Sequence, residues 1–227
     1  DDDSSMVFKG KLTPVNSALS TISYTPTANS TESALVTIDI NDQGHSGGGN
    51  QGVATAEIEI DITAINDAPI ITLPSEAAGH TNAPIVIDPI VIDDPDARAN
   101  QVEVTLTTTK GTIDLENTQQ LTFIEGDGTG DESMTFLAII SRANSTLETV
   151  SFTSEEGFLG TADLVVEVDD LGNVGEGGAQ TATATLEIAV EDFGQAPTAS
   201  KDSYVVDEDE ILVVEADQGP LQNDADP

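Results

Sequence analysis

The 227-residue sequence contains no cysteine and no tryptophan. Without cysteine, the chain has no disulfide, no thiolate metal ligand and no thiol nucleophile. Aromatic residues make up only 4% of the chain, which argues against the large aromatic-lined pocket of many small-molecule sites. No run of about 20 apolar residues is present, so the sequence predicts no membrane-spanning helix.

Positive charge is also scarce. Six Lys and Arg residues stand against 42 Asp and Glu residues, which gives a formal net charge of −36. Nucleic acids and anionic membranes both need a positive protein face, so neither is an expected partner. The two histidines, His45 and His80, lie in unrelated loop-like stretches, which argues against a two-histidine metal site or a Ser-His-Asp triad. We therefore expect no enzymatic activity.

Short runs of Val, Ile and Leu alternate with polar residues along the chain. In residues 54–62, Ala and Ile occupy one face and Thr, Glu and Asp the other. This period of two is typical of a strand with one buried face. Similar runs cover 36–40, 101–106, 164–168 and 183–190, and turn-forming residues separate them. The pattern predicts an all-β fold built as a two-layer antiparallel sandwich.

Two short segments have helical rather than strand character. Thr13 followed by Pro14 predicts a cap residue and a first helical residue, with a helical turn running to Leu19. Residues 141–147 occupy the matching place in the repeat described next. We expect each segment to form one short helical turn that crosses between sheets.

The sequence repeats itself at a spacing of 128 residues. Residues 3–69 and 131–197 share 22 identities over 67 ungapped positions. Such a fixed period indicates tandem units, each here the length of a whole domain. Ala-Pro pairs at 68–69 and 196–197 mark the boundaries, so 1–68 is the later part of one unit, 69–196 a complete unit and 197–227 the beginning of another. We expect the chain to be a piece of a longer tandem array with stiffened junctions.

Acidic residues gather at strand ends and at the unit boundaries. The clusters are Asn66-Asp67, Asp93-Asp94-Pro95-Asp96, Asp169-Asp170, Asp207-Glu208-Asp209-Glu210 and Asn223-Asp224-Ala225-Asp226. Calcium takes six to eight oxygen ligands in irregular geometry, whereas magnesium retains its waters and needs an octahedron. The clusters therefore predict Ca²⁺ sites, which also relieve the self-repulsion of so negative a chain.

Several of these motifs resemble those of cadherin repeats. "ITAINDAP" looks like the junction motif of that family, "VIDDPDA" is similar to its Asp-x-Asp loop, and "LVVEVDD" and "VTIDIND" resemble the strand that ends in a calcium-binding Asp. "TSEEG" stands where cadherins place an acidic pair. The segment from "APTASKDSYVV" to the last residue looks like the opening of cadherin-like domains in giant bacterial surface adhesins of the RTX and biofilm type.

That resemblance implies tandem Ig-like Greek-key sandwiches with calcium at each junction. Carried over by position, the first junction uses Asn66 and Asp67 from the linker together with Asp94, Asp96 and Asp170 from the following unit. The second uses Glu155 and Glu156 before it and Asp224 and Asp226 after it. Its linker departs from the pattern, because Phe193-Gly194-Gln195 replaces Ile65-Asn66-Asp67 and only Asp192 lies nearby.

The expected function is a calcium-stiffened extender of a secreted or cell-surface bacterial adhesin that contributes to cell adhesion and biofilm formation. Its partners are then calcium and the neighbouring repeats of the same chain. A second reading is a cadherin-like module that binds a polysaccharide or a surface protein. A third is a subunit of an extracellular filament or sheath, in which 1–68 of one copy completes 197–227 of another by strand donation.

Overall fold

The computed structural model describes residues 4–45, 49–97, 99–172, 174–192, 198–215 and 219–224. The chain divides into two compact units. Unit 1 comprises Asp1–Asp67 together with Gly172–Gly178, and unit 2 comprises Ala68–Leu171 together with Ala179–Pro227. Each unit is described by itself below.

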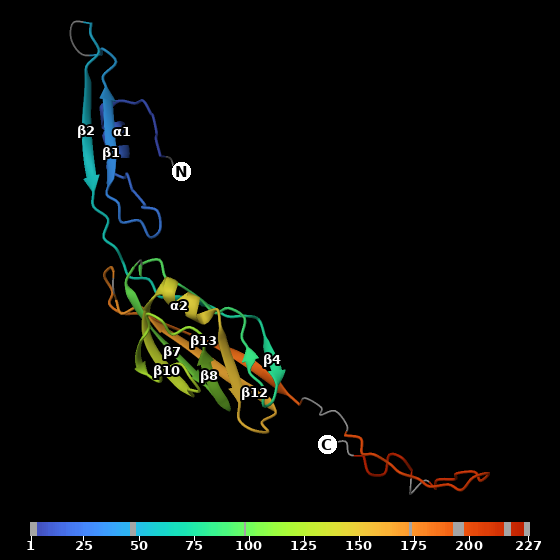
Figure 1. The fold of residues 1–227 in the computed structure, drawn as a ribbon. Coiled ribbons are helices and arrows are strands. Elements are labelled where there is room, and N and C mark those ends of the chain that lie inside the picture. Colours follow the sequence, from blue (N-terminus) through green and yellow to red (C-terminus); the bar gives the residue numbers. More distant parts are fainter. Residues whose placement is uncertain are drawn as a thin grey trace. The chain divides into compact units, whose positions relative to one another are not determined.

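Within its described residues, unit 1 contains one helix and one hairpin. Helix α1 (Leu12–Leu19) precedes strands β1 (Ala34–Asn41) and β2 (Val53–Ile60), which pair antiparallel. Figure 1 shows β1 and β2 as a long two-stranded hairpin. The alternating run predicted at 54–62 forms strand β2, but most of its apolar face is exposed, with Ile58 46% accessible. A two-stranded hairpin has no second sheet to cover its apolar face, which explains this exposure.

The start of α1 corrects one detail of the sequence prediction. Lys11, not Thr13, is the N-cap residue, and it makes no side-chain capping hydrogen bond. Pro14 is consequently the third helical residue and not the first. Proline is tolerated there because the first four amides of a helix have no intrahelical acceptor, so none is lost.

Unit 2 contains eleven strands and one helix among its described residues. The strands are β3 (Ile70–Thr72), β4 (Ala77–His80), β5 (Ile85–Val86), β6 (Val91–Asp93), β7 (Gln101–Thr108), β8 (Gly111–Leu115), β9 (Thr122–Glu125), β10 (Ser133–Ile139), β11 (Val150–Ser154), β12 (Gly160–Asp169) and β13 (Thr181–Glu191). Helix α2 (Ile140–Leu147) follows β10 directly. The main sheet has six strands in the order β4-β13-β12-β7-β10-β9, all antiparallel except the β4–β13 pair. A second sheet has the order β5-β11-β8, and β3 pairs with β6.

One apolar core joins the two larger sheets. From the six-stranded sheet it takes alternate residues of β7, β10, β12 and β13, and from the three-stranded sheet alternate residues of β8 and β11. Phe136 and Phe152 are its largest fully buried side chains. The period-two alternation read from the sequence at 101–106, 164–168 and 183–190 is therefore confirmed in both its strand type and its buried face. The chain is all-β apart from the two helices.

Helix α2 is tied to β6 by one side chain. Asn144 accepts a hydrogen bond from the Ile92 amide at 2.8 Å and donates from Nδ2 to the Ile92 carbonyl at 2.9 Å. The primary amide thus imitates a neighbouring strand, because it presents one acceptor and one donor in a plane. The apolar side of the helix, Ala143 and Leu147, is fully buried.

The 128-residue repeat is reproduced in the elements of the two units. Leu12–Leu19 of α1 and Ile140–Leu147 of α2 are the same eight positions of the repeat. The pairs Ala34↔Ile60 of β1–β2 and Ala162↔Ile188 of β12–β13 also coincide after the shift, so both hairpins have one register. The hairpin of unit 1 is therefore the counterpart of the last two strands of unit 2.

Candidate metal site

Three of the predicted metal ligands lie together in unit 2. Asp94 and Asp96 follow β6, and Asp170 follows β12. All three side chains are buried, with 7%, 9% and 2% of their surfaces exposed. Buried Asp residues are rare unless a partner offsets the loss of hydration, so three of them at two strand ends form an unusual cluster.

Asp94 is the centre of this cluster, and its two oxygens differ. Oδ1 accepts hydrogen bonds from the amides of Asp96 at 2.7 Å and Ala97 at 3.0 Å, which fixes the turn after β6. Oδ2 is buried and has no hydrogen-bond partner. A buried carboxylate oxygen without a donor is costly, because it loses its hydration and gains nothing in return.

The electrostatics of Asp94 agree with that geometry. Burial raises the pKa of the Asp94 carboxyl above its ordinary value of 3.8. The two amide hydrogen bonds counteract this increase, and the nearby carboxylates of Asp170 and Asp96 add to it. A cation at the unpartnered oxygen would offset both the burial and the repulsion.

Asp170 closes the base of the loop that joins β12 to β13. Its amide donates to the Gln180 carbonyl at 3.1 Å, and its Oδ1 accepts from the Gln180 amide at 2.8 Å. Unit 1 has the same arrangement 128 positions earlier, where Asp42 pairs with Gly52 at 3.1 Å and 2.7 Å. We call this paired Asp and its partner the loop neck. It positions the Asp170 carboxylate and does so as a repeated feature of the fold.

The donor set suits a hard cation. Carboxylate oxygens from three Asp residues are ligands that Ca²⁺ accepts in irregular arrangements. Among the residues that the structure describes, however, no group of three or more His, Asp or Glu side chains, these three Asp residues included, is placed so that it could hold a metal ion. Asp94 Oδ1 and Asp170 Oδ1 accept hydrogen bonds from main-chain amides, whereas Asp94 Oδ2 accepts none.

The linker residues predicted for the same junction belong to unit 1. Asn66 is 3% exposed, and its Nδ2 donates to the Gly178 carbonyl at 2.9 Å. Its amide donates to the Glu176 carbonyl at 2.9 Å. Asp67 is exposed. The role of these two residues as metal ligands stays a prediction.

The residues predicted for the second junction are spread over the chain. Glu155, Glu156 and Asp192 are exposed, and the Glu155 amide donates to the Lys110 carbonyl. Asp224 accepts a hydrogen bond from the Ser200 amide at 2.8 Å through Oδ1. Asp226 lies outside the described residues, as do Phe193, Gly194 and Gln195 of that linker.

The loop after β12 makes a contact that the sequence analysis does not predict. Gly175, Glu176 and Gly178 of this loop lie against Ile65 and Asn66. A signal was present in the repeat, because Gly175 and Gly177 coincide with Gly47 and Gly49 after the 128-residue shift.

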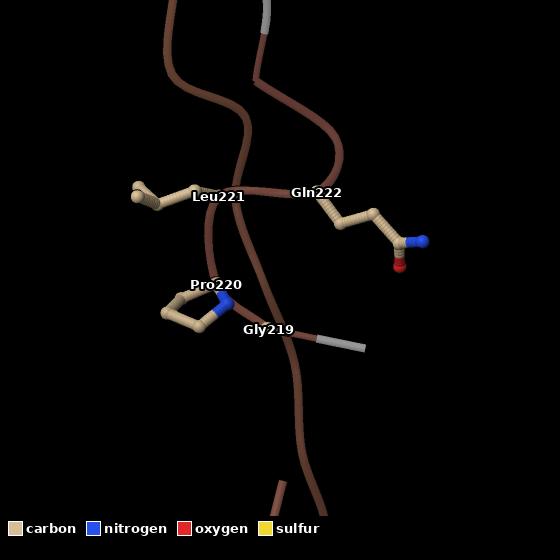
Figure 2. Close-up of a pocket in the computed structure, with 4 residues that line it drawn as sticks. All are labelled: Gly219, Pro220, Leu221 and Gln222. Carbon is tan, nitrogen blue, oxygen red and sulfur yellow. The ribbon is translucent and has the colours of Figure 1, made fainter. Parts of the chain in front are cut away.

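Two pockets lie in the segment that follows β13, and the lining of one includes Lys201, Asp202, Ser203 and Tyr204. Figure 2 shows a shallow pocket lined by Gly219, Pro220, Leu221 and Gln222, whose side chains diverge and include neither a nucleophile nor a charged group. None of the described helices has the length and apolarity needed to cross a bilayer.

Comparisons with known proteins identify no family for this chain. No family model matches it, and no curated protein matches it. A solved structure described as "Complete structure of manganese lipoxygenase of Gaeumannomyces graminis and partial structure of zonadhesin of Komagataella pastoris" is similar at 14% identity and a TM-score of 0.31. The match covers 72% of this chain and 57% of that chain. At that TM-score the likeness carries no argument about fold or function.

Proposed function

We propose that this chain is a calcium-stiffened extender segment of a large secreted or cell-surface bacterial adhesin. In this role, tandem β domains hold a distal binding region away from the cell and contribute to adhesion. The observation that supports it best is the buried corner of Asp94, Asp96 and Asp170, with its unpartnered Asp94 Oδ2. The repeat of helix, hairpin and loop neck at a spacing of 128 residues supports the tandem arrangement.

The proposal includes an Ig-like Greek-key sandwich for the complete unit. A six-stranded sheet and a three-stranded sheet that share one core favour this architecture. The absence of cysteine suits a domain whose core is large enough to need no disulfide, since 25 apolar residues are buried in it.

Calcium supplies the charge that the chain lacks. With six basic residues against 42 acidic ones, buried carboxylates in unit 2 have few cationic side chains available. Asp94, Asp96 and Asp170 would hold the ion, and the linker residues Asn66 and Asp67 are the further ligands we expect. Extracellular modules bind calcium with dissociation constants of about 10⁻⁴ to 10⁻³ M, so the site fills outside the cell.

Isothermal titration of the chelator-stripped protein tests the site directly. We expect CaCl2 to bind with a dissociation constant in the range of about 10⁻⁴ to 10⁻³ M and MgCl2 to bind at least about tenfold more weakly. The variant Asp94→Asn should weaken calcium binding by about tenfold or more, because it removes the charge at the unpartnered oxygen.

Asp88→Asn is the matched control. Asp88 is exposed and, like Asp94, is followed by proline. Its replacement by asparagine changes the net charge by the same amount as Asp94→Asn. It should bind calcium as the unmodified protein does. Equal weakening in both variants, or no saturable calcium binding in the unmodified protein, would overturn the proposed site.

A further inference from the structure

The loop between β12 and β13 binds the extended segment that precedes unit 2 in the sequence. Within unit 1, the Glu176 amide donates to the Ala64 carbonyl and the Asn66 amide donates to the Glu176 carbonyl, both at 2.9 Å. Ile65 and Glu176 thereby form a parallel β-bridge. A third hydrogen bond runs from Asn66 Nδ2 to the Gly178 carbonyl, also at 2.9 Å. The loop and the segment therefore recognise each other as two strands do, through main-chain groups.

Gly175 makes this close approach possible. Its φ is +103°, and a Cβ atom at this position would lie 2.5 Å from the Asn66 nitrogen and 2.7 Å from the Ile65 carbonyl carbon. Both neighbours are main-chain atoms that cannot rotate away. Any residue other than glycine would therefore be excluded by the backbone conformation and by the clash.

The base of the loop is closed independently of the linker. The loop neck of Asp170 and Gln180 holds the two ends of the β12–β13 connection together through two hydrogen bonds. Unit 1 repeats that neck at Asp42 and Gly52. A preformed neck lowers the entropy lost when the loop binds a second segment, because less of the loop has to be ordered.

We propose that Gly175–Gly178 forms a clasp that binds the extended residues 64–66, sets their register through Asn66, and keeps them ordered without calcium. The clasp binds an extended peptide that offers a main-chain carbonyl, a main-chain amide and, at its end, an asparagine side chain. Asn66 is then a positioning residue of the linker, whether or not it also contacts an ion. This inference does not depend on the proposed calcium site.

Amide hydrogen exchange measured by NMR on the full chain in excess chelator tests the clasp. We expect the Asn66 and Glu176 amides of the unmodified protein to be protected. Gly175→Ala should raise their exchange rates by about tenfold or more, since the hydrogen bonds at both amides are lost. Asn66→Ala removes only the side-chain bond, so we expect a smaller rise at Glu176 than in Gly175→Ala.

Gly157→Ala is the matched control. Gly157 also has a positive φ, of +72°, but no atom lies within 4 Å of a Cβ placed there. It should leave both amides protected, and the Val166 amide in β12 should stay protected in all three variants, which shows that the fold is intact.

The outcomes separate this proposal from the calcium proposal. Protection of both amides in chelator that is lost in Gly175→Ala and kept in Gly157→Ala supports the clasp even when calcium does not bind. Protection that appears only after calcium is added overturns the clasp and leaves the calcium site standing. Unprotected amides under both conditions, or unchanged protection in Gly175→Ala, also overturn it.

Discussion

The variant Asp94→Asn should be more stable than the unmodified protein in chelator and less stable than the unmodified protein in calcium. The substitution preserves the shape of the side chain and an Oδ1 acceptor for the Asp96 and Ala97 amides. It removes the buried charge whose second oxygen has no partner and which lies near Asp96 and Asp170. The same charge is the strongest candidate to hold calcium. Its loss should therefore stabilise the folded protein in chelator and destabilise it in calcium.

The magnitude follows from two opposing effects. A buried charge costs more than a buried neutral amide, and the Asp96 and Asp170 carboxylates repel it, so we expect Asp94→Asn to raise the free energy of unfolding by about 1 kcal/mol in chelator. For a dissociation constant of about 10⁻⁴ M, calcium at about 10 mM stabilises the unmodified protein by about 2.7 kcal/mol. In calcium, the free energy of unfolding of the unmodified protein should then exceed that of a variant that binds no calcium by about 1.7 kcal/mol.

Urea denaturation of both proteins, followed by circular dichroism at 218 nm or by a comparable far-ultraviolet signal, measures this difference under each condition. Thermal melting should show the same crossing, with a separation of several degrees on each side, because about 1 kcal/mol shifts the melting temperature of a domain this size by about 3–5 °C. Asp88→Asn controls for the change in net charge and should follow the unmodified protein in both buffers.

The same order of stability between the two proteins in chelator and in calcium would contradict this role of Asp94. A variant that is less stable than the unmodified protein in chelator would show that the Asp94 charge already has a stabilising partner. A variant that gains as much from calcium as the unmodified protein would show that the ion binds elsewhere.

Three further predictions concern stability. Asn144→Ala should lower the free energy of unfolding by about 2–3 kcal/mol in urea, because the Ile92 amide and carbonyl both lose their partner, whereas Ser145→Ala should change it by less than about 0.5 kcal/mol. Gly111→Ala should lower the free energy of unfolding by about 3 kcal/mol or more, because a Cβ atom there would lie 2.3 Å from the Thr153 carbonyl oxygen. Its control is Gly130→Ala, where no atom lies within 4 Å of the added Cβ, so only the strain of the positive φ remains, about 1 kcal/mol. Urea midpoints measure both changes. Because the pKa of Asp94 is raised in the folded state, the ionised Asp94 carboxylate destabilises the fold and the protonated form does not. In chelator, the gain in free energy of unfolding from Asp94→Asn should therefore be largest at pH 7 and should shrink as the pH falls through the raised pKa toward 3.8. Urea midpoints measured against pH test this, and a gain that grows on acidification would contradict it.

The strands were readable from the sequence because their signal is local. A strand needs only alternation within a few residues, and 101–106, 164–168 and 183–190 carry it without interruption. The same pattern at 54–62 correctly predicts a strand but not its exposure, because burial depends on a second layer that neighbouring residues do not encode. The start of α1 differs from the prediction by two residues for a related reason: Thr13 has the chemistry of a cap, but Lys11 is the N-cap residue and the helix begins at Leu12.

The candidate site shows where sequence reasoning ends. The run Asp93-Asp94-Pro95-Asp96 contains three identical side chains, and nothing in their order tells that Asp94 has the buried, unpartnered oxygen. That property arises from tertiary contacts, including the charge of Asp170 from a distant strand end. The clasp is equally non-local, since Asn66 and Gly178 are 112 positions apart.

The high negative charge makes a specific calcium effect separable from a general one. Any salt screens repulsion among 42 acidic residues, with a screening length of about 8 Å at physiological ionic strength, and so stabilises the chain whether or not a site exists. Screening acts alike on the unmodified protein and on Asp94→Asn, and sodium chloride at matched ionic strength reproduces it. Site binding instead saturates, favours calcium over magnesium and disappears with the Asp94 charge. Calcium binding at the cluster of Asp94, Asp96 and Asp170 is therefore the part of the calcium response that sodium chloride does not reproduce and that Asp94→Asn abolishes.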